Sequence, residues 1–443
     1  MTRPTRLALV LAGIVFGQFV LYGPSLLGRK VLLPLDLLTV PKFYLPQTPE
    51  VSKITPDNKS LPDLIFLCEP ARRFAVSELH AGRLPMWAPY QFAGVPFIWP
   101  KFSPFMALRF AIASPVVLAW SQLLAAIVAG LGAYLFCRAV LAVSFWPAAI
   151  AGWCYPLTGF FVFWQGFPTG LAVHWLPWIL LAVDKTVRGR SALAPVGLSL
   201  VTGLVLVSGH LDVAGQVLLV SGLYAVWGLG CILMLPLENR CSSAREGSDG
   251  RSAGPARQGP SELAQPAQAG SRPALTASGW GAPQRRRAMR AVLALTAGWG
   301  LGFLLAAPYL LPTAEYVRTG ARMVRRSAGQ EERPPFGVGA LPETVLPDVY
   351  GTDRVGSFRY SGDIQIESAA AAYTGLLATL VVAPLAWRSQ RHRVSNLFWV
   401  LLGFGGLCWC LDIPGVVDLL RLPGINMFSH NRLTLRPPSA SSL

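Results

Sequence analysis

Long apolar runs, separated by short polar stretches, dominate this chain. The first run, from Leu7 to about Leu27, has no charged residue and approaches the ~20 residues that a helix needs to cross a bilayer. It is long for a cleaved signal peptide and lacks a small-residue cleavage motif. The pattern predicts an all-α polytopic membrane protein with about nine transmembrane helices. The later runs lie near 113–136, 144–163, 170–184, 192–209, 213–236, 289–312, 367–387 and 395–411.

Polar segments divide these runs into modules. Residues 28–112 and 313–366 carry many charges of both signs and are predicted to form two large extracytoplasmic loops. Residues 238–288 are rich in Gly, Ser, Ala, Pro, Gln and Arg without periodicity, which predicts a disordered basic cytoplasmic linker. We therefore expect an N-terminal membrane module over 1–237 and a C-terminal one over 289–443.

One stretch of the first outer loop has a helical pattern. Apolar positions recur at helical spacing from Asp63 to about Gly82, which predicts a short helix on the membrane surface. Gly82 would end this helix, and Pro85 would prevent its continuation.

Positive charge agrees with this topology. The formal net charge is +16, and a strongly basic chain is typical of nucleic-acid binding. Much of the excess positive charge lies beside the apolar runs, however, where it sets the orientation of the helices in the membrane. We therefore expect a multi-pass protein of the inner (plasma) membrane with a cytoplasmic N-terminus and no nucleic-acid partner. The seven cysteines form neither a disulfide framework nor a zinc-binding spacing. The predicted cytoplasmic charges include Arg3, Arg6, Arg138, Lys185, Arg188, Arg190, Arg388, Arg391 and Arg393.

Two carboxylates of the first outer loop, Asp63 and Asp36, lie in apolar surroundings. A carboxylate near the membrane surface can act as general base on an acceptor hydroxyl while a lipid phosphate leaves. A loop aspartate is more often a solvated or capping residue, and this alternative stays open for both.

Paired arginines of the outer loops are candidates for binding that phosphate. Arg72 and Arg73 lie in the first loop, and Arg325 and Arg326 lie in the second. Guanidinium groups bind phosphate by bidentate hydrogen bonds. A purely structural role is the alternative for each.

Aromatic and histidine side chains complete the candidate site. Trp87 and Tyr90 offer flat faces to a sugar, or form an interfacial belt. His174 and His210 lie at the outer ends of predicted spans, where a hydrogen-bonded helix terminus is commoner than a proton relay. No phosphate-binding glycine loop, HExxH, GxSxG or metal-ligand spacing is present in the sequence.

The run from Asp63 through Phe97 resembles the first outer loop of bacterial YfhO-type membrane proteins. These are distant members of the GT-C class of polyprenyl-phosphate-sugar-dependent glycosyltransferases. Weaker similarity covers most of the chain apart from the linker, in LLPLDLL, YPLTGFF, HWLPW, SGHLD, LPDVYG, ESAAAAYTG and LPGINMFSHNR. Ala88 and Ala93 depart from the family pattern. The matching positions are Asp63, Pro70, Gly82, Leu84, Pro85, Trp87, Pro89, Tyr90, Phe92, Gly94 and Pro96.

This resemblance implies a GT-C-like fold with a catalytic aspartate in the first outer loop and sugar transfer outside the membrane. By position, Asp63 matches the loop acid of the family, and Asp36 is the second candidate. The implied partners are a polyprenyl-phosphate-linked sugar, membrane lipid, and an extracytoplasmic acceptor such as a cell-wall polymer, lipid or protein. Some GT-C enzymes use a divalent metal, Mg or Mn, although this sequence presents no clear ligand set.

Two alternatives stay open. A transporter or flippase of a lipid-linked substrate would place charged or broken helices at the bilayer midplane, whereas few charges lie deep in these runs. The chain also ends in LRPPSASSL soon after Arg432, earlier than in family members, which indicates a truncated and inactive member as the other alternative.

Overall fold

The computed structural model of this protein is mostly helical (76%). Within the described residues, four helices are long and apolar enough to span a membrane: α1 (Arg3–Leu26), α4 (Val117–Ala139), α9 (Leu211–Met234) and residues Gln284–Arg318 of α11. The described residues are 2–41, 44–56, 62–91, 93–97, 99, 102–189, 191–234, 282–320, 337–347, 349–351, 372–376, 378–387, 393–410, 413 and 415.

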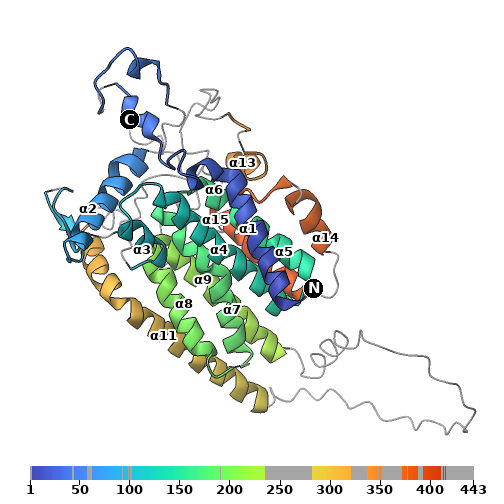
Figure 1. Cartoon of the computed structure of the whole chain (residues 1–443). Helices are drawn as coiled ribbons and strands as arrows, with labels where there is room; N and C mark the ends of the chain where they lie inside the picture. The colour runs from blue at the N-terminus through green and yellow to red at the C-terminus, as the bar shows by residue number, and fades with distance from the viewer. Residues whose placement is uncertain are drawn as a thin grey trace, which may run out of the picture.

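The helices form one bundle (Figure 1). On one side, α1 packs against α4 and α5 (Phe145–Cys154). On the other side, α8 (Ala194–Ser208) packs along α11 (Ala282–Thr319), and α7 (Leu176–Val187) lies against α4, α8 and α9.

Small residues allow the close contact between α8 and α11. A Cβ atom on Gly302 of α11 would lie 2.5 Å from the Cβ of Thr202 on α8. A Cβ atom on Gly298 would lie 2.9 Å from the side chain of Leu198. Glycines of this kind let helix backbones approach closely where lipid gives no hydrophobic driving force for association.

The other predicted spans are shorter or broken. The run at 144–163 divides into α5, a turn at Tyr155–Leu157 and α6 (Gly159–Phe163). The run at 170–184 begins as the 3-10 helix η5 (Pro168–Trp175) before α7. Pro156 and Pro168 lie at these breaks, and proline lacks the N–H that continues a helical ladder.

Beyond α11, the described part of the C-terminal module consists of shorter helices. It contains η6 (Gly337–Ala340), α13 (Leu341–Val345), the π-turn η9 (Ala378–Val382), α14 (Ala383–Trp387) and α15 (Arg393–Cys410). The count of nine spans therefore stays a prediction.

The boundary predicted for the linker differs from the structure. Helix α11 begins at Ala282, inside the range 238–288 predicted as linker, and continues past residue 313, where the second outer loop was expected to begin. Ala, Gln and Arg at the start of α11 are good helix formers, so the helix extends beyond the apolar run. Residues 238–281 lie outside the described residues.

The predicted helix of the first outer loop is confirmed. It consists of a π-turn, η3 (Leu64–Cys68), followed by α2 (Glu69–His80). Gly82 has φ +72°, a left-handed conformation that favours glycine, and its N–H donates to the carbonyl of Leu79 at 3.0 Å.

Two short strands follow α2. Strand β1 (Trp87–Ala88) pairs antiparallel with β2 (Val95–Pro96), and Trp87 lies opposite Pro96. Next comes α3 (Pro104–Ala111), which lies between α2 and α4. Upstream, two 3-10 turns, η1 (Leu35–Thr39) and η2 (Val51–Lys53), complete the described part of this loop.

The outer module, named for the predicted outer loop and defined as η3, α2, the β1–β2 hairpin and α3, has a core of its own that joins it to the bundle. Figure 1 draws it at one end of the bundle, with the hairpin beside the end of α11. Its position is therefore held by packing on the helices. The buried residues of this core are Ala71, Ala75, Ala88, Phe97, Phe105, Met106, Phe110, Ala125 and Leu171.

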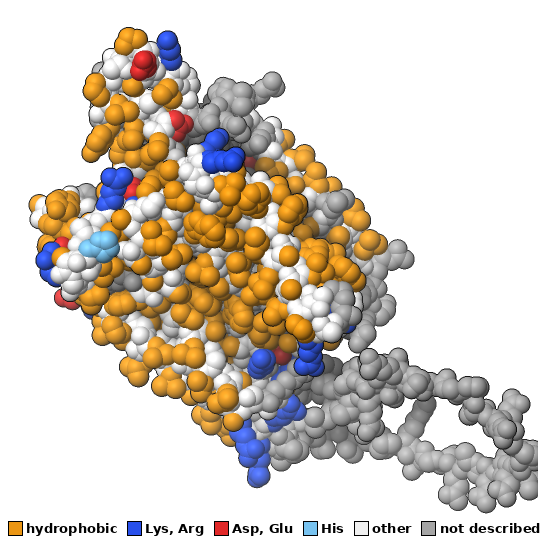
Figure 2. Space-filling view, viewed as in Figure 1, with side chains coloured by type: hydrophobic (Ala, Val, Ile, Leu, Met, Phe, Trp, Pro, Cys, Tyr) orange, Lys and Arg blue, Asp and Glu red, His pale blue; other side chains and the backbone are white. Residues whose placement is uncertain are grey.

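Charged and apolar side chains occupy different parts of the face shown in Figure 2. Hydrophobic side chains cover the body of the bundle, and Lys, Arg, Asp and Glu gather towards its two ends. This distribution is typical of helices surrounded by lipid, and it agrees with the four span-length helices.

Candidate functional site

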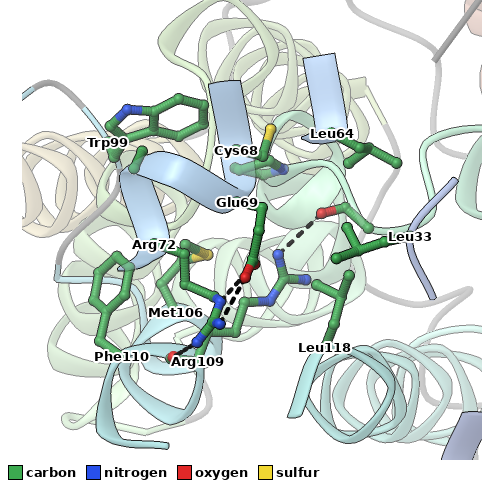
Figure 3. A pocket seen from close by; sticks show the side chains of 13 residues that line it. Leu33, Leu64, Cys68, Glu69, Arg72, Trp99, Met106, Arg109, Phe110 and Leu118 are labelled. Carbon is green, nitrogen blue, oxygen red and sulfur yellow. Dashed lines mark hydrogen bonds and ion pairs between the residues drawn. The ribbon is translucent and has the colours of Figure 1, made fainter. Parts of the chain in front are cut away.

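A small cavity lies where the outer module meets the bundle (Figure 3). Its volume is about 20 Å³, which is room for one water-sized molecule. Three ionisable side chains line it, Glu69, Arg72 and Arg109, together with Cys68. The remaining wall is mostly apolar and consists of Leu33, Leu64, Ala71, Trp99, Met106, Phe110, Leu118, Gly166 and Pro168.

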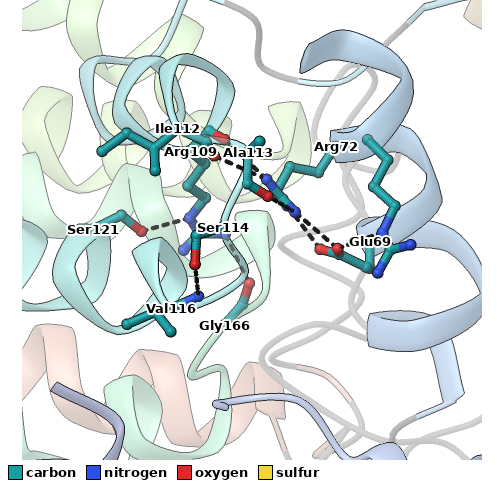
Figure 4. A network of polar contacts seen from close by, with 10 residues as sticks. Glu69, Arg72, Arg109, Ile112, Ala113, Ser114, Val116, Ser121 and Gly166 are labelled. Carbon is teal, nitrogen blue, oxygen red and sulfur yellow. Dashed lines mark hydrogen bonds and ion pairs between the residues drawn. The ribbon is translucent and has the colours of Figure 1, made fainter. Parts of the chain in front are cut away.

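Arg72 is buried, and it joins α2 to the end of α3 (Figure 4). Its Nε and Nη2 donate to the two carboxylate oxygens of Glu69 at 2.7 and 2.8 Å. Its other N–H groups donate to the carbonyls of Arg109, Ile112 and Ala113 at 3.3, 3.1 and 2.9 Å. A guanidinium has five N–H donors, so Arg72, predicted to bind the donor phosphate, has none left for one.

Glu69 is the carboxylate of this network. Besides Arg72 it accepts a hydrogen bond from Nε of Arg73 at 2.9 Å. Burial raises the pKa of Glu69, but the hydrogen bonds and charges of Arg72 and Arg73 outweigh burial and bring its pKa below the ordinary value. Arg73 itself is largely exposed, so it remains accessible to a ligand.

Arg109 is buried without a comparable counter-charge. Its side chain donates to Ser121 Oγ, to the carbonyl of Gly166 at 3.0 Å and to Gln122 Oε1 at 3.4 Å, all of them neutral acceptors. No carboxylate of the described residues forms an ion pair with it. Burial lowers its pKa to about 10, so it is still a cation at neutral pH.

Arg109 was not among the residues predicted from sequence. A signal was present, since an arginine between Leu108 and Phe110 interrupts an apolar stretch. Ionisable residues in such stretches are rare and often functional. Only the structure reveals that its partners are neutral.

The two candidate aspartates belong to segments that meet at the cavity. Asp63 directly precedes Leu64 and is exposed, without a capping hydrogen bond to η3. Asp36 is half-buried in η1, three residues after Leu33. Leu33 and Leu64, which lie close to them in sequence, line the cavity, whereas neither Asp63 nor Asp36 does.

Cys68 lines the cavity and lies within electrostatic reach of Asp63. After burial, the charges nearest its thiol act on the pKa: Arg109 lowers it, and Asp63 and Glu69 raise it. Burial is the dominant effect and raises the pKa of the thiol to about 12, which makes it a poor nucleophile at neutral pH.

The aromatic and histidine candidates lie elsewhere. Trp87 and Tyr90 are exposed on the hairpin and do not line the cavity, whereas Trp99 does. His174 is buried between the rings of Phe105 and Phe161, with Nδ1 3.1 Å from the carbonyl of Gly170. It therefore occupies a packed, hydrogen-bonded position.

His210 does not line the cavity. His210 is partly exposed, with Nδ1 3.7 Å from the carboxylate of Asp212 at the start of α9. Arg325 and Arg326 lie outside the described residues. Among the residues that the structure describes, no three His, Cys, Asp or Glu side chains are grouped to bind a metal.

A larger apolar groove lies between α8 and α11. Its volume is about 300 Å³. Phe102, which directly precedes the N-cap of α3, forms part of its wall. The other wall residues are Leu200, Gly203, Leu204, Val207, Leu305, Ala306, Pro308 and Tyr309.

No protein-family model, curated protein or solved structure matches the chain. The resemblance to YfhO-type proteins therefore rests on its motifs and stays a prediction.

Proposed function

We propose that this protein is a membrane glycosyltransferase that moves a sugar from a polyprenyl-phosphate carrier to an extracytoplasmic acceptor, such as a cell-wall polymer, lipid or protein. One observation carries the proposal. Arg109 is a buried cation with neutral partners, and it lines a cavity next to the segments of Asp63 and Asp36. The proposal includes a plasma-membrane location, a cytoplasmic N-terminus and an outer-face site.

A phosphate would complete the electrostatics of this site. Burying an unpaired guanidinium costs several kcal/mol, roughly, and an anionic ligand offsets that cost. Arg109 makes three hydrogen bonds to described residues, whereas a guanidinium can donate five. Arg73 adds an exposed second cation on the neighbouring helix. The cavity holds a water-sized molecule, so phosphate binding would require side chains of the outer module to move apart.

The apolar groove suits the other end of such a substrate. An isoprenoid chain needs apolar walls, and the groove between α8 and α11 is apolar apart from the hydroxyl of Tyr309. Phe102 links it to α3, the helix that carries Arg109. Together the groove and the cavity would accommodate an apolar tail and an anionic head.

Asp63 is the base that fits the reaction best. It would take the proton of the acceptor hydroxyl as the hydroxyl oxygen attacks C1 of the sugar. The bond from C1 to the phosphate oxygen breaks, and the phosphate leaves with the electron pair, held by Arg109. Direct displacement without a covalent enzyme intermediate inverts the configuration at C1.

A transporter or flippase of a lipid-linked substrate is the second candidate. Two features favour it, a non-helical residue at Tyr22 inside α1 and two prolines, Pro308 and Pro312, inside α11. Broken helices are common at the substrate sites of transporters.

The test is a mass-spectrometric profile of glycans and lipids. It compares cells lacking the protein with cells given the native chain, Asp63→Asn, Arg109→Met or the control Glu78→Gln. Glu78 pairs with Arg83 on the exposed side of α2. We expect a sugar modification that the native and control chains restore and that both site variants lose by about 100-fold or more, typical of a lost catalytic base.

Other outcomes would change the assignment. If Asp63→Asn restores the modification, then Asp36→Asn is the next variant, because its segment reaches the same cavity. If a lipid-linked sugar accumulates on one face of the membrane and Asp63→Asn has no effect, the protein is a transporter. If no strain differs from another, the chain is inactive in sugar transfer.

A further inference from the structure

Four neighbouring side chains of the β1–β2 hairpin and its approach are unusually exposed. Leu84, Met86, Trp87 and Tyr90 are 62%, 49%, 55% and 84% exposed. Soluble surfaces rarely present so many apolar and aromatic groups within seven residues. They take no part in the cavity at Arg109, so the site proposed above does not account for them.

The hairpin holds two of these rings in fixed positions. A Cβ atom on Gly94, which has φ +115°, would lie 2.9 Å from the indole of Trp87, so the indole lies directly against the backbone there. The ring of Tyr90 packs edge-on against Phe74 of α2, with centroids 5.7 Å apart. Each of the two exposed rings therefore has a packing contact that positions it on the module.

The position of the hairpin relates it to the lipid-facing surface. Strand β2 contacts α11, and Figure 1 draws the hairpin beside the outer end of that helix. Leu304 and Leu311 of α11 are 68% and 69% exposed, as lipid-facing residues of a span-length helix would be. The hairpin thus continues the apolar surface of α11 to the end of the bundle.

The chemistry of the patch favours lipid over carbohydrate. Leu84 and Met86 provide neither flat rings nor hydrogen bonds for a sugar. Arg83 and Arg73 are exposed nearby, on the same module. Trp and Tyr rings beside aliphatic and cationic side chains are characteristic of the boundary between headgroups and acyl chains.

We propose that the hairpin is a membrane-interface anchor, in which Leu84, Met86, Trp87 and Tyr90 insert into the outer leaflet. The anchor holds α2, and with it the Arg109 cavity, at the depth of the lipid phosphates. This inference does not depend on sugar transfer, since a transporter would use the same anchor.

Photocrosslinking of the full chain in phosphatidylethanolamine and phosphatidylglycerol nanodiscs tests the anchor. A benzophenone amino acid replaces Leu84 in one variant and Tyr90 in a second. Leu304 on α11 is the lipid-facing position for comparison. Ile54 is the water-facing one, because it is 49% exposed in a segment that Figure 1 draws beyond α2, away from α11. Mass spectrometry after illumination identifies the adduct on each peptide.

We expect phospholipid adducts at positions 84 and 90 at levels close to those at 304, and about tenfold above those at 54, as for side chains at the membrane interface. Two insertion positions are used so that one variant that fails to fold does not decide the result. Adducts at 84 and 90 as low as those at 54, with strong labelling at 304, would overturn the anchor. Adducts to a glycan or to protein in place of phospholipid would overturn it as well.

Discussion

The two ends of the helix bundle bury charge in different ways. At the end that carries the outer module, called the outer end for its predicted position, two buried guanidinium groups, Arg72 and Arg109, share a cavity with a single carboxylate, Glu69. At the opposite end, called the inner end for its predicted position, α7 ends and α11 begins, and the buried Asp184 meets one arginine, Arg188, at 2.7 Å.

The inner pair is local and balanced. Asp184 lies on α7, and Arg188, four residues later, caps the end of that helix. The hydroxyl of Tyr224 on α9 donates to the same carboxylate oxygen at 3.3 Å. Arg287 of α11 donates to the carbonyl of Arg188 at 3.0 Å. These contacts join three helices and need no ligand charge.

The cavity is lined by two buried guanidinium groups, Arg72 and Arg109, and by one carboxylate, Glu69. The comparison teaches that a buried ion pair is weak evidence of a site, whereas buried charge in excess is stronger evidence. The following changes test this difference, from the largest expected effect to the smallest.

Arg72→Met should cause the largest loss of stability. It leaves Glu69 buried with only Arg73 and removes the donors to three carbonyls at the end of α3. Breaking a buried pair in this way costs about 3–5 kcal/mol in the free energy of unfolding. The measurement is thermal unfolding of the purified chain in detergent. Arg73→Met is the matched control, because Arg73 binds the same carboxylate but is exposed, and it should cost less than about 1 kcal/mol.

Arg109→Met should destabilise the chain less than Arg72→Met. The substitution removes three hydrogen bonds to neutral groups, but it also removes the cost of burying an unpaired cation. The two effects oppose each other, so we expect a net change of about 1 kcal/mol, with a large loss of lipid-phosphate binding. Native gels with added dodecyl phosphate would measure that binding. A loss of stability equal to that of Arg72→Met would instead indicate that Arg109 already has an anionic partner within the protein.

Asp184→Asn should have a small effect at the inner end. Arg188 is about a third exposed and can turn to solvent, and Asn keeps an oxygen for the hydroxyl of Tyr224. We expect a cost of at most about 1 kcal/mol, because partly exposed pairs contribute little. Thermal unfolding under the same conditions measures it. A cost of the size expected for Arg72→Met would remove the contrast between the two ends.

Acid should loosen the outer module before it unfolds the bundle. The pKa of Glu69 is lower in the folded protein than its ordinary value of 4.5. Its contribution to stability is therefore fully present above pH 4.5 and is lost as the pH falls below that value, through the folded pKa. Limited digestion with pepsin at decreasing pH should cut α2 first. The Glu69→Gln variant should lose this pH dependence, and digestion that remained uniform along the chain would contradict the expectation.

Labelling of Cys68 is the simplest test and has the smallest expected effect, because it needs no substitution. Since burial raises the pKa of its thiol to about 12, maleimide should label it slowly in the folded chain at pH 7 and readily after denaturation. Peptide mass spectrometry distinguishes it from Cys154, which is exposed. Rapid labelling of Cys68 in the folded protein would mean that the outer module opens often.

Local sequence was sufficient to predict some elements. The helix of the first outer loop and its end at Gly82 follow from helical periodicity and a left-handed glycine, which depend only on near neighbours. The four span-length helices follow from runs of apolar residues. The breaks around Pro156 and Pro168 were missed, because a continuous apolar run outweighed the prolines in the prediction.

Long-range contacts were not predictable in the same way. Arg72 was expected to bind phosphate, yet its donors are taken by carbonyls about forty residues away in the sequence. His174 was a candidate for the substrate site, and the sequence did not reveal that it packs between Phe105 and Phe161. Which side chain faces a cavity depends on how helices pack, and no local pattern encodes it.

The sequence by itself therefore determined a mostly helical chain with helices long and apolar enough to cross a membrane, because these properties depend on composition and spacing. Only the tertiary structure decided which charges are balanced. It paired Arg72 with Glu69 and left Arg109 with neutral partners, because a buried charge is satisfied or not by groups that distant parts of the chain bring to it.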